Sequence, residues 1–197
     1  MSAVPLICEK YGQNPFENRI LETIAIIYTG RYYHTVLPII NKEDKYQCKI
    51  HAYCMMTNHI HLLLETSEDE IGRFMKCLSE RYAMYFNHKY QYRGHLFESR
   101  YKSCLVKEDS YFLQTSRYIH LNPVKARIVV KPEDYRWSSY QTMIALKDDR
   151  ITERNRTLAY FKDNSILRYR DFVEDIGHKY VVQEHEIKKS MEELPFD

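Results

Sequence analysis

The sequence predicts an α+β fold in which an antiparallel sheet carries helices on one face. Three observations predict it: short apolar segments typical of strands, longer segments with apolar residues at helical spacing, and the order in which the two kinds alternate. That order is strand, helix, strand, strand, helix, strand, helix. The first six elements form the βαββαβ pattern of a ferredoxin-like sandwich, and the seventh is a helix that follows the sheet.

The N-terminal elements are a strand and a helix that follow an irregular lead-in at residues 1–19. The segment ILETIAIIYTG, residues 20–30, is rich in isoleucine and ends at a glycine, which predicts a buried strand. Residues 31–45 are compatible with a helix, although Pro38 would kink or break it.

A strand hairpin follows at residues 47–65. QCKIHAYCMM, residues 47–56, is typical of a strand, and HIHLLLE, residues 59–65, is typical of its returning partner. The polar pair Thr57 and Asn58 supplies the turn between them.

The first long helix is predicted from Glu68 to His88. Apolar side chains recur there at helical spacing, and Asp69 and Glu70 lie in the first turn, where the helix dipole favours negative charge. A strand is predicted at residues 100–106, in the segment RYKSCLV.

The last helix of the main domain is predicted at residues 107–122, in KEDSYFLQTSRYIHLN. Its first turn is acidic, and Pro123 is expected to end it because the residue before a proline avoids the helical region. The chain becomes more polar after Pro132, and a further helix is expected at residues 166–177.

Length and composition indicate an ordered protein with one main domain. The chain has 197 residues, of which 44% are hydrophobic and 28% charged, enough apolar side chains for a sizeable core. We expect a domain at residues 1–145 and a helical extension at 146–197. The net charge of +2 is too small to indicate a nucleic-acid binder by itself, so any basic surface must be local.

Cysteine usage and hydropathy favour a cytoplasmic protein. The five cysteines are scattered and form no CxxC pair, which is typical of reduced thiols rather than a disulfide framework or a zinc site. No apolar run is long enough for a signal peptide or a membrane span, so we expect no membrane association.

The histidine pair in HIHLLLE is a candidate metal site. Alternate residues of a strand point to one face, so His59 and His61 lie side by side, about 7 Å apart along the strand, with Ile60 turned away. The two imidazoles can converge on one cation. By themselves, however, two histidines at this spacing are more often half-buried side chains that share a face, and a catalytic ion needs a third protein ligand in any case.

The helix before Pro123 offers such a ligand. Tyr118 and Asn122 are four residues apart and therefore lie on one helical face. If the helix packs near the histidines, Asn122 can complete the coordination and Tyr118 can reach the bound ligand. Tyr118 is one of 18 tyrosines, however, and periodicity does not favour it over Tyr111 or Tyr101 as a functional residue.

Basic and aromatic side chains are interleaved between residues 73 and 107. This mixture suits phosphate contacts and base stacking on single strands or hairpins. The candidate DNA-binding residues are Arg73, Lys76, Arg81, Arg93, His95, Arg100, Tyr101 and Lys102. For the first three, a solvated helix face is an equally good explanation.

Four segments in this order resemble the single-tyrosine HUH transposases of the IS200-like family: HAYCMMTNHIHLLLE, GHLFESRYKSCLV, YIHLNPVKA and WSSY. The likeness runs from Lys49 to Tyr140 and is closest to the REP-associated tyrosine transposases. The chain departs from the family pattern at Thr57, where a proline is usual, and at Arg127, where glycine is common. Residues 20–30 also lack the usual YHxxxRG pattern.

The resemblance implies an enzyme of DNA transposition and recombination, a single-stranded DNA endonuclease that rejoins what it cuts. The HUH motif maps to His59, Ile60 and His61, and the two histidines with Asn122 would bind Mg²⁺ or Mn²⁺. Tyr118 would be the nucleophile that forms a 5′-phosphotyrosine intermediate.

The same resemblance implies single-stranded DNA with hairpin or palindromic elements as the partner, and it allows a homodimer that exchanges the tyrosine helix. Two alternatives stay open at this point. The chain could be a domesticated hairpin-binding protein that no longer cuts, or a metal-dependent phosphodiesterase that uses activated water.

Overall fold

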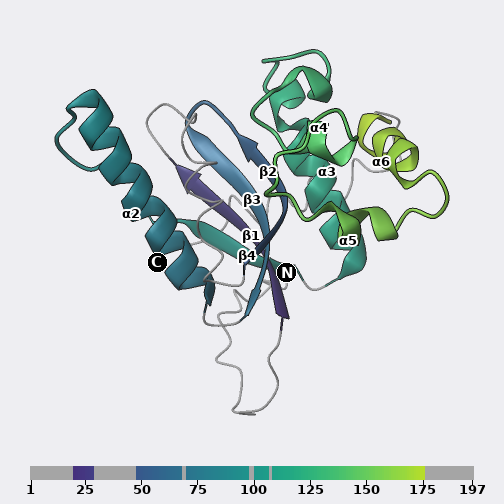
Figure 1. Cartoon of the computed structure of the whole chain (residues 1–197), viewed down its shortest axis with the longest axis horizontal. Coiled ribbons are helices and arrows are strands. Elements are labelled where there is room, and N and C mark those ends of the chain that lie inside the picture. The colour runs from purple at the N-terminus through teal and green to yellow at the C-terminus, as the bar shows by residue number, and fades with distance from the viewer. Residues whose placement is uncertain (1–19, 29–47, 68–69, 98–99, 107, 176–197) are drawn as a thin grey trace, which may run out of the picture.

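The computed structural model describes residues 20–28, 48–67, 70–97, 100–106 and 108–175 (Figure 1). The lead-in at 1–19 and the helix expected at 31–45 lie outside these residues. Within the described part of the chain, no helix is long and apolar enough to cross a membrane.

Four strands form one antiparallel sheet. They are β1 (Ile20–Tyr28), β2 (Lys49–Met55), β3 (His59–Ser67) and β4 (Lys102–Val106). The order across the sheet is β2-β3-β1-β4, and each neighbouring pair is antiparallel. β3 therefore lies between β1 and β2, which is the split arrangement of a ferredoxin-like sheet. The predicted α+β fold is confirmed.

Strand alternation sorts the side chains of β3 between two helices. Ile60, Leu62 and Leu64 are buried in the cluster formed with helix α2 (Glu70–Tyr90). Leu63 is buried in a second cluster, formed with helix α3 (Asp109–Lys125). Figure 1 shows α2 and α3 on opposite sides of the sheet. The helix that carries Tyr118 therefore covers the face left open by α2, so the described helices lie on both faces of the sheet and not on one as expected.

Helix α3 corrects the prediction that Pro123 ends it, because the helix continues to Lys125. A proline in the middle of a helix removes one N–H donor and lowers helix stability by about 3 kcal/mol. Here it lies in the last turn, where the remaining carbonyls are paired: Ala126 N–H donates to the Asn122 carbonyl and Ile128 N–H to the Pro123 carbonyl, each at 2.9 Å.

Arg127 follows the end of α3 in the left-handed conformation, at φ 56°. This is the position after a helix C-cap, where glycine is common because it has no Cβ. The backbone therefore explains why a glycine suits this position.

The C-terminal elements surround α3. They are a 3-10 turn η2 (Pro132–Asp134) and the helices α4 (Tyr140–Met143), α5 (Arg154–Ala159) and α6 (Ser165–Glu174). The helix expected at 166–177 corresponds to α6, and residues 176 and 177 lie outside the described part. A third apolar cluster joins α3 to α4 and α6 through Leu121, Tyr140 and Tyr169.

The segment between η2 and α5 covers the outer edge of β2. Met55 N–H donates to the Trp137 carbonyl at 3.0 Å, and Glu153 N–H donates to the Ile50 carbonyl at 2.7 Å. An exposed edge strand invites pairing with other chains, and these bonds occupy it. They also connect the C-terminal elements to the strand beside β3.

Glu65 ties the same region to the sheet by charge. Its buried carboxylate accepts from Lys49 Nζ at 2.6 Å and Arg156 at 2.8 Å, and it contacts His51 Nε2 at 3.0 Å. Burial alone would raise the pKa of Glu65, but the hydrogen bonds from Lys49, Arg156 and His51 outweigh it and lower the pKa to about 2.

We expect Glu65→Gln to lose stability in a pH-dependent way. The folded pKa lies below the unfolded value, so the stabilisation by the carboxylate is present above about pH 4.5 and is lost as the pH falls toward 2. The shift corresponds to on the order of 3 kcal/mol in the free energy of unfolding. Urea unfolding of both proteins between pH 6 and pH 2 measures it.

The control is Glu80→Gln, which alters an exposed carboxylate whose contact is with Lys76 at 3.9 Å on the surface of α2. It should differ little from the unmodified protein at any pH. A constant stability gap for Glu65→Gln across this pH range would contradict the role given to the carboxylate.

Candidate functional site

The two histidines of β3 converge as strand alternation predicts. Their Nε2 atoms lie 2.8 Å apart, and the ring centroids are 4.6 Å apart with the planes at 84°. Both side chains point to the face covered by α3, because they alternate with Ile60 and Leu62, which face α2. His61 is buried and His59 is half-buried.

The hydrogen bonds of the pair define how it can act. His59 Nδ1 lies 2.7 Å from the Asn58 amide oxygen, which can only accept, so Nδ1 carries the proton and Nε2 keeps its lone pair. Burial lowers the pKa of His59, and burial together with the neighbouring His59 lowers the pKa of His61 to about 3. Both imidazoles are therefore neutral at physiological pH.

Neutral imidazoles with convergent nitrogens suit a divalent ion. Two nitrogens at about 2.1 Å from one ion and at right angles lie roughly 3 Å from each other, close to the spacing of the two Nε2 atoms. His61 Nδ1 is buried without a hydrogen-bond partner among the described residues. No three His, Cys, Asp or Glu side chains gather around one point among the described residues.

Tyr118 lies against this pair. Its ring is perpendicular to that of His61, with 5.7 Å between centroids, and its side chain is 9% exposed. Lys125 places its ammonium 4.9 Å from the centre of the Tyr118 ring. Sequence reasoning missed Lys125, although its position seven residues after Tyr118 puts both on one helical face.

Asn122 lies one turn after Tyr118. Its amide nitrogen donates to the Tyr118 carbonyl at 2.9 Å, which leaves the amide oxygen as the atom that can accept or coordinate. The bond ties the side chain to the helix that carries Tyr118.

The candidate DNA-binding residues lie in three places: on α2 and its face of the sheet, on the face of the histidines, and in the segment between α2 and β4. Arg73, Lys76 and Arg81 are exposed on α2, across the sheet from the histidines. Tyr101 packs against the α2 cluster, where its hydroxyl approaches Gly72.

Lys102 differs because strand register places it on the face of the histidines. Ile26 of β1 pairs with His61 on one side and with Lys102 on the other, and directly paired residues share a face. The two backbones are two strand spacings apart, roughly 10 Å.

Arg93, His95 and Arg100 are exposed in the segment between α2 and β4. Gly94 turns the chain at φ 127°, a conformation that favours glycine, and Leu96 is buried in the α2 cluster. Arg93 and His95 are therefore held on a turn anchored by its apolar neighbour.

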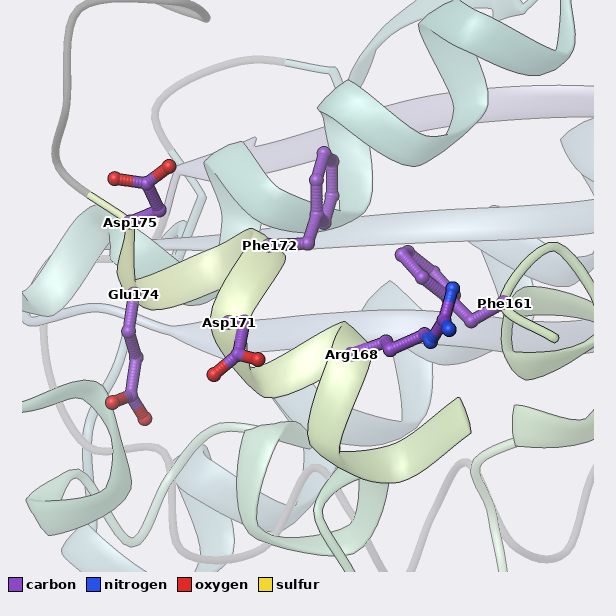
Figure 2. Close-up of a pocket in the computed structure, with 6 residues that line it drawn as sticks. All are labelled: Phe161, Arg168, Asp171, Phe172, Glu174 and Asp175. Carbon is purple, nitrogen blue, oxygen red and sulfur yellow. The ribbon is translucent and has the colours of Figure 1, made fainter. Parts of the chain in front are cut away.

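A pocket of about 570 Å³ lies on α6, away from these residues. Figure 2 shows its lining, in which Phe161 and Phe172 pack with 5.6 Å between ring centroids and Arg168, Asp171, Glu174 and Asp175 supply the polar groups. None of these is a candidate site residue.

Comparisons with known proteins find a family and a solved structure to which this chain is similar. The family model described as IS200-like transposase matches residues 19–122, a range that contains both histidines, Tyr118 and Asn122. The fold is similar to the structure of a REP-associated tyrosine transposase bound to a REP hairpin, with a TM-score of 0.53 and 16% identity over 70% of this chain and 89% of that chain. No curated protein sequence matches the chain.

We expect His59→Ala and His61→Ala to weaken Mn²⁺ binding by at least tenfold, because each removes one of two convergent ring nitrogens. Titration of free Mn²⁺ followed by electron paramagnetic resonance measures the affinity. His88→Ala, which alters an exposed histidine in the last turn of α2, is the matched control. Unchanged Mn²⁺ affinity in both site variants would exclude the pair as ligands.

Proposed function

The chain belongs to the IS200-like transposase family, and we propose that it is a metal-dependent transposase that cuts and rejoins single-stranded DNA through Tyr118. The observation that carries the proposal is the contact between the Tyr118 ring and His61, whose imidazole meets that of His59. A phenol of α3 and two neutral imidazoles of β3 thus meet in one place, although 57 positions separate Tyr118 from His61 in the sequence.

His59, His61 and Asn122 are the residues that would hold Mg²⁺ or Mn²⁺. When bound, the ion would polarise the scissile phosphate and stabilise its developing charge. The histidines suit this role because burial keeps both imidazoles neutral, and a neutral imidazole can present an unprotonated nitrogen to an ion. Asn122 suits this role because its amide nitrogen donates to the Tyr118 carbonyl, and its amide oxygen takes no part in that bond.

Tyr118 would act as the nucleophile. Its hydroxyl oxygen attacks phosphorus as its proton is lost, the bond from phosphorus to the 3′ oxygen breaks, and that oxygen leaves as a 3′-OH after gaining a proton. The products are a 5′-phosphotyrosine and a free 3′ end. Attack by a 3′-OH reverses the step and joins a strand, so no nucleotide cofactor is required.

Lys125 would assist this attack. A free tyrosine has a pKa near 10 and is a weak nucleophile at neutral pH. A cation close to the ring stabilises the phenolate more than the phenol. The Lys125 ammonium lies 4.9 Å from the ring centre, where it would stabilise negative charge that develops on the Tyr118 oxygen during the attack.

Hairpin-forming single-stranded DNA is the substrate that we propose. The similar solved structure is of a REP-associated tyrosine transposase bound to a REP hairpin, and this chain has basic side chains beside its site and on the turn after α2. Lys102 shares the face of the histidines, whereas Arg93 and His95 project from that turn. Together they supply phosphate contacts for a substrate longer than the cleaved bond.

We expect Tyr118→Phe to abolish covalent attachment to DNA. A labelled hairpin oligonucleotide incubated with the unmodified protein and Mn²⁺ should give a protein–DNA adduct on a denaturing gel, and the variant should give none because it lacks the attacking oxygen. Tyr111→Phe, on the same helix and half-buried, is the control that should keep the adduct.

Two results would replace this function with an alternative. Hairpin binding without any adduct from the unmodified protein would indicate a binding protein. Cleavage that survives Tyr118→Phe but is lost in His59→Ala would indicate a phosphodiesterase that uses activated water.

We expect the double variant Arg93→Ala, Lys102→Ala to bind the hairpin more weakly and with a smaller dependence on salt. Each lost phosphate contact should reduce the slope of log K against log salt by about 1. The hairpin affinity is measured by fluorescence anisotropy in EDTA at salt concentrations from about 50 to 200 mM. Lys162→Ala, an exposed lysine between α5 and α6, should leave the slope unchanged, and an unchanged slope in the double variant would refute the assignment.

A further inference from the structure

A chain of buried polar groups runs along α3 on the side away from the histidine pair. Ser116 and His120 are four residues apart and share a helical face, whereas Tyr118 lies between them in sequence and points elsewhere. Ser116 Oγ lies 2.5 Å from the Tyr169 hydroxyl of α6, and that hydroxyl lies 2.8 Å from His120 Nδ1. These three residues are fully buried.

The same chain continues to the sheet. His120 Nε2 lies 2.8 Å from Ser139 Oγ, and Ser139 Oγ accepts from the Tyr53 backbone N–H at 2.9 Å. Tyr53 belongs to β2 and pairs with Leu62, the residue after His61. His120 therefore connects the helix that carries Tyr118 to the strand beside the histidine pair, and also to α6.

Such a connection restrains α3 more tightly than apolar packing does. Apolar side chains accept small slides and rotations, but a buried hydrogen bond is lost when its atoms move apart, and an unpaired buried polar group is costly. Both ring nitrogens of His120 are engaged, so the helix can neither turn nor shift without breaking a bond at one end. A displacement of about 1 Å at a reacting group can cost roughly 100-fold in rate.

Arg117 adds a second link between α3 and α6. Its guanidinium donates to the backbone carbonyls of Phe172 at 2.8 Å and Asp175 at 2.6 Å. Residues 116, 117 and 120 thus hold α6 on the side of α3 remote from the sheet, so α3 is clamped from both sides.

We infer that His120 is a positioning residue, and that α6, through Tyr169, belongs to the apparatus that holds Tyr118 against the histidine pair. The inference rests on the proposed function of Tyr118. It assigns the C-terminal helix a role in the rate of strand cleavage, separate from hairpin binding.

Tyr169→Phe tests it against a matched control, Tyr140→Phe. Both variants remove one hydroxyl from the same apolar cluster and keep the ring. The Tyr169 hydroxyl bonds Ser116 and His120, whereas the Tyr140 hydroxyl donates to Glu174 at 2.7 Å. Three quantities are measured on the full chain: the single-turnover rate of adduct formation with a hairpin oligonucleotide and Mn²⁺, the hairpin affinity in EDTA, and the melting temperature.

We expect Tyr169→Phe to slow adduct formation at least tenfold with unchanged hairpin affinity, and Tyr140→Phe to keep the rate of the unmodified protein. The melting temperatures of the two variants should agree within about 4 °C. Nitrogen NMR of His120 gives an independent signature, because loss of the Tyr169 hydroxyl should turn one tautomer into a mixture. Ser139→Ala breaks the chain at its other end and should slow the reaction similarly, which keeps the test available if Tyr169→Phe does not fold.

Equal rates for Tyr169→Phe and Tyr140→Phe would overturn the inference and leave the proposed function intact. So would a loss of rate in Tyr169→Phe that is matched by an equal loss of hairpin affinity. Absence of a Tyr118 adduct in the unmodified protein would instead overturn the proposed function, and the inference with it.

Discussion

The arrangement depends on the two-residue alternation of β3, a strand buried on both faces. Its even-numbered residues from Ile60 to Leu64 pack under α2, while His61 and Leu63 face α3. A slip of one residue against either neighbour would turn both imidazoles into the apolar core below α2 and the leucines toward Tyr118. The large apolar area buried by these leucines therefore also determines which face carries the histidines.

Helix α3 serves two surfaces because position 118 points in one direction and positions 116 and 120 in another. Tyr118 meets the histidine pair, and Ser116 and His120 meet α6 and the segment after η2. The helix is thus held by apolar contacts with the sheet and by hydrogen bonds that reach both α6 and, through Ser139, the backbone of β2. Apolar burial supplies stability without direction, and the hydrogen bonds supply direction.

Charge is distributed unevenly around the site. The histidines are neutral because they are buried, whereas the carboxylate of Glu65, on the same strand, stays ionised because Lys49, Arg156 and His51 hydrogen-bond to it. Lys102 and Lys125 bring positive charge to the face of the histidines. A face with neutral imidazoles and nearby cations is suited to a phosphate, which brings its own negative charge.

The sequence by itself determined the strand hairpin, both long helices, the shared face of His59 and His61, and the pairing of Tyr118 with Asn122, because each depends on local periodicity. It did not determine that α3 covers the face opposite α2, nor that His120 bonds partners 19 and 49 positions away. The sequence also predicted that α3 ends at Pro123, whereas the helix continues to Lys125 because backbone hydrogen bonds pair the carbonyls of its last turn. A bulge at His51 puts His51 and Ala52 on the same face of β2, which strict strand alternation does not predict. Only the tertiary structure decided these points. Contacts between distant segments form where apolar faces pack and buried polar groups are hydrogen-bonded at the same time. Local periodicity carries no information about which distant segment supplies those contacts.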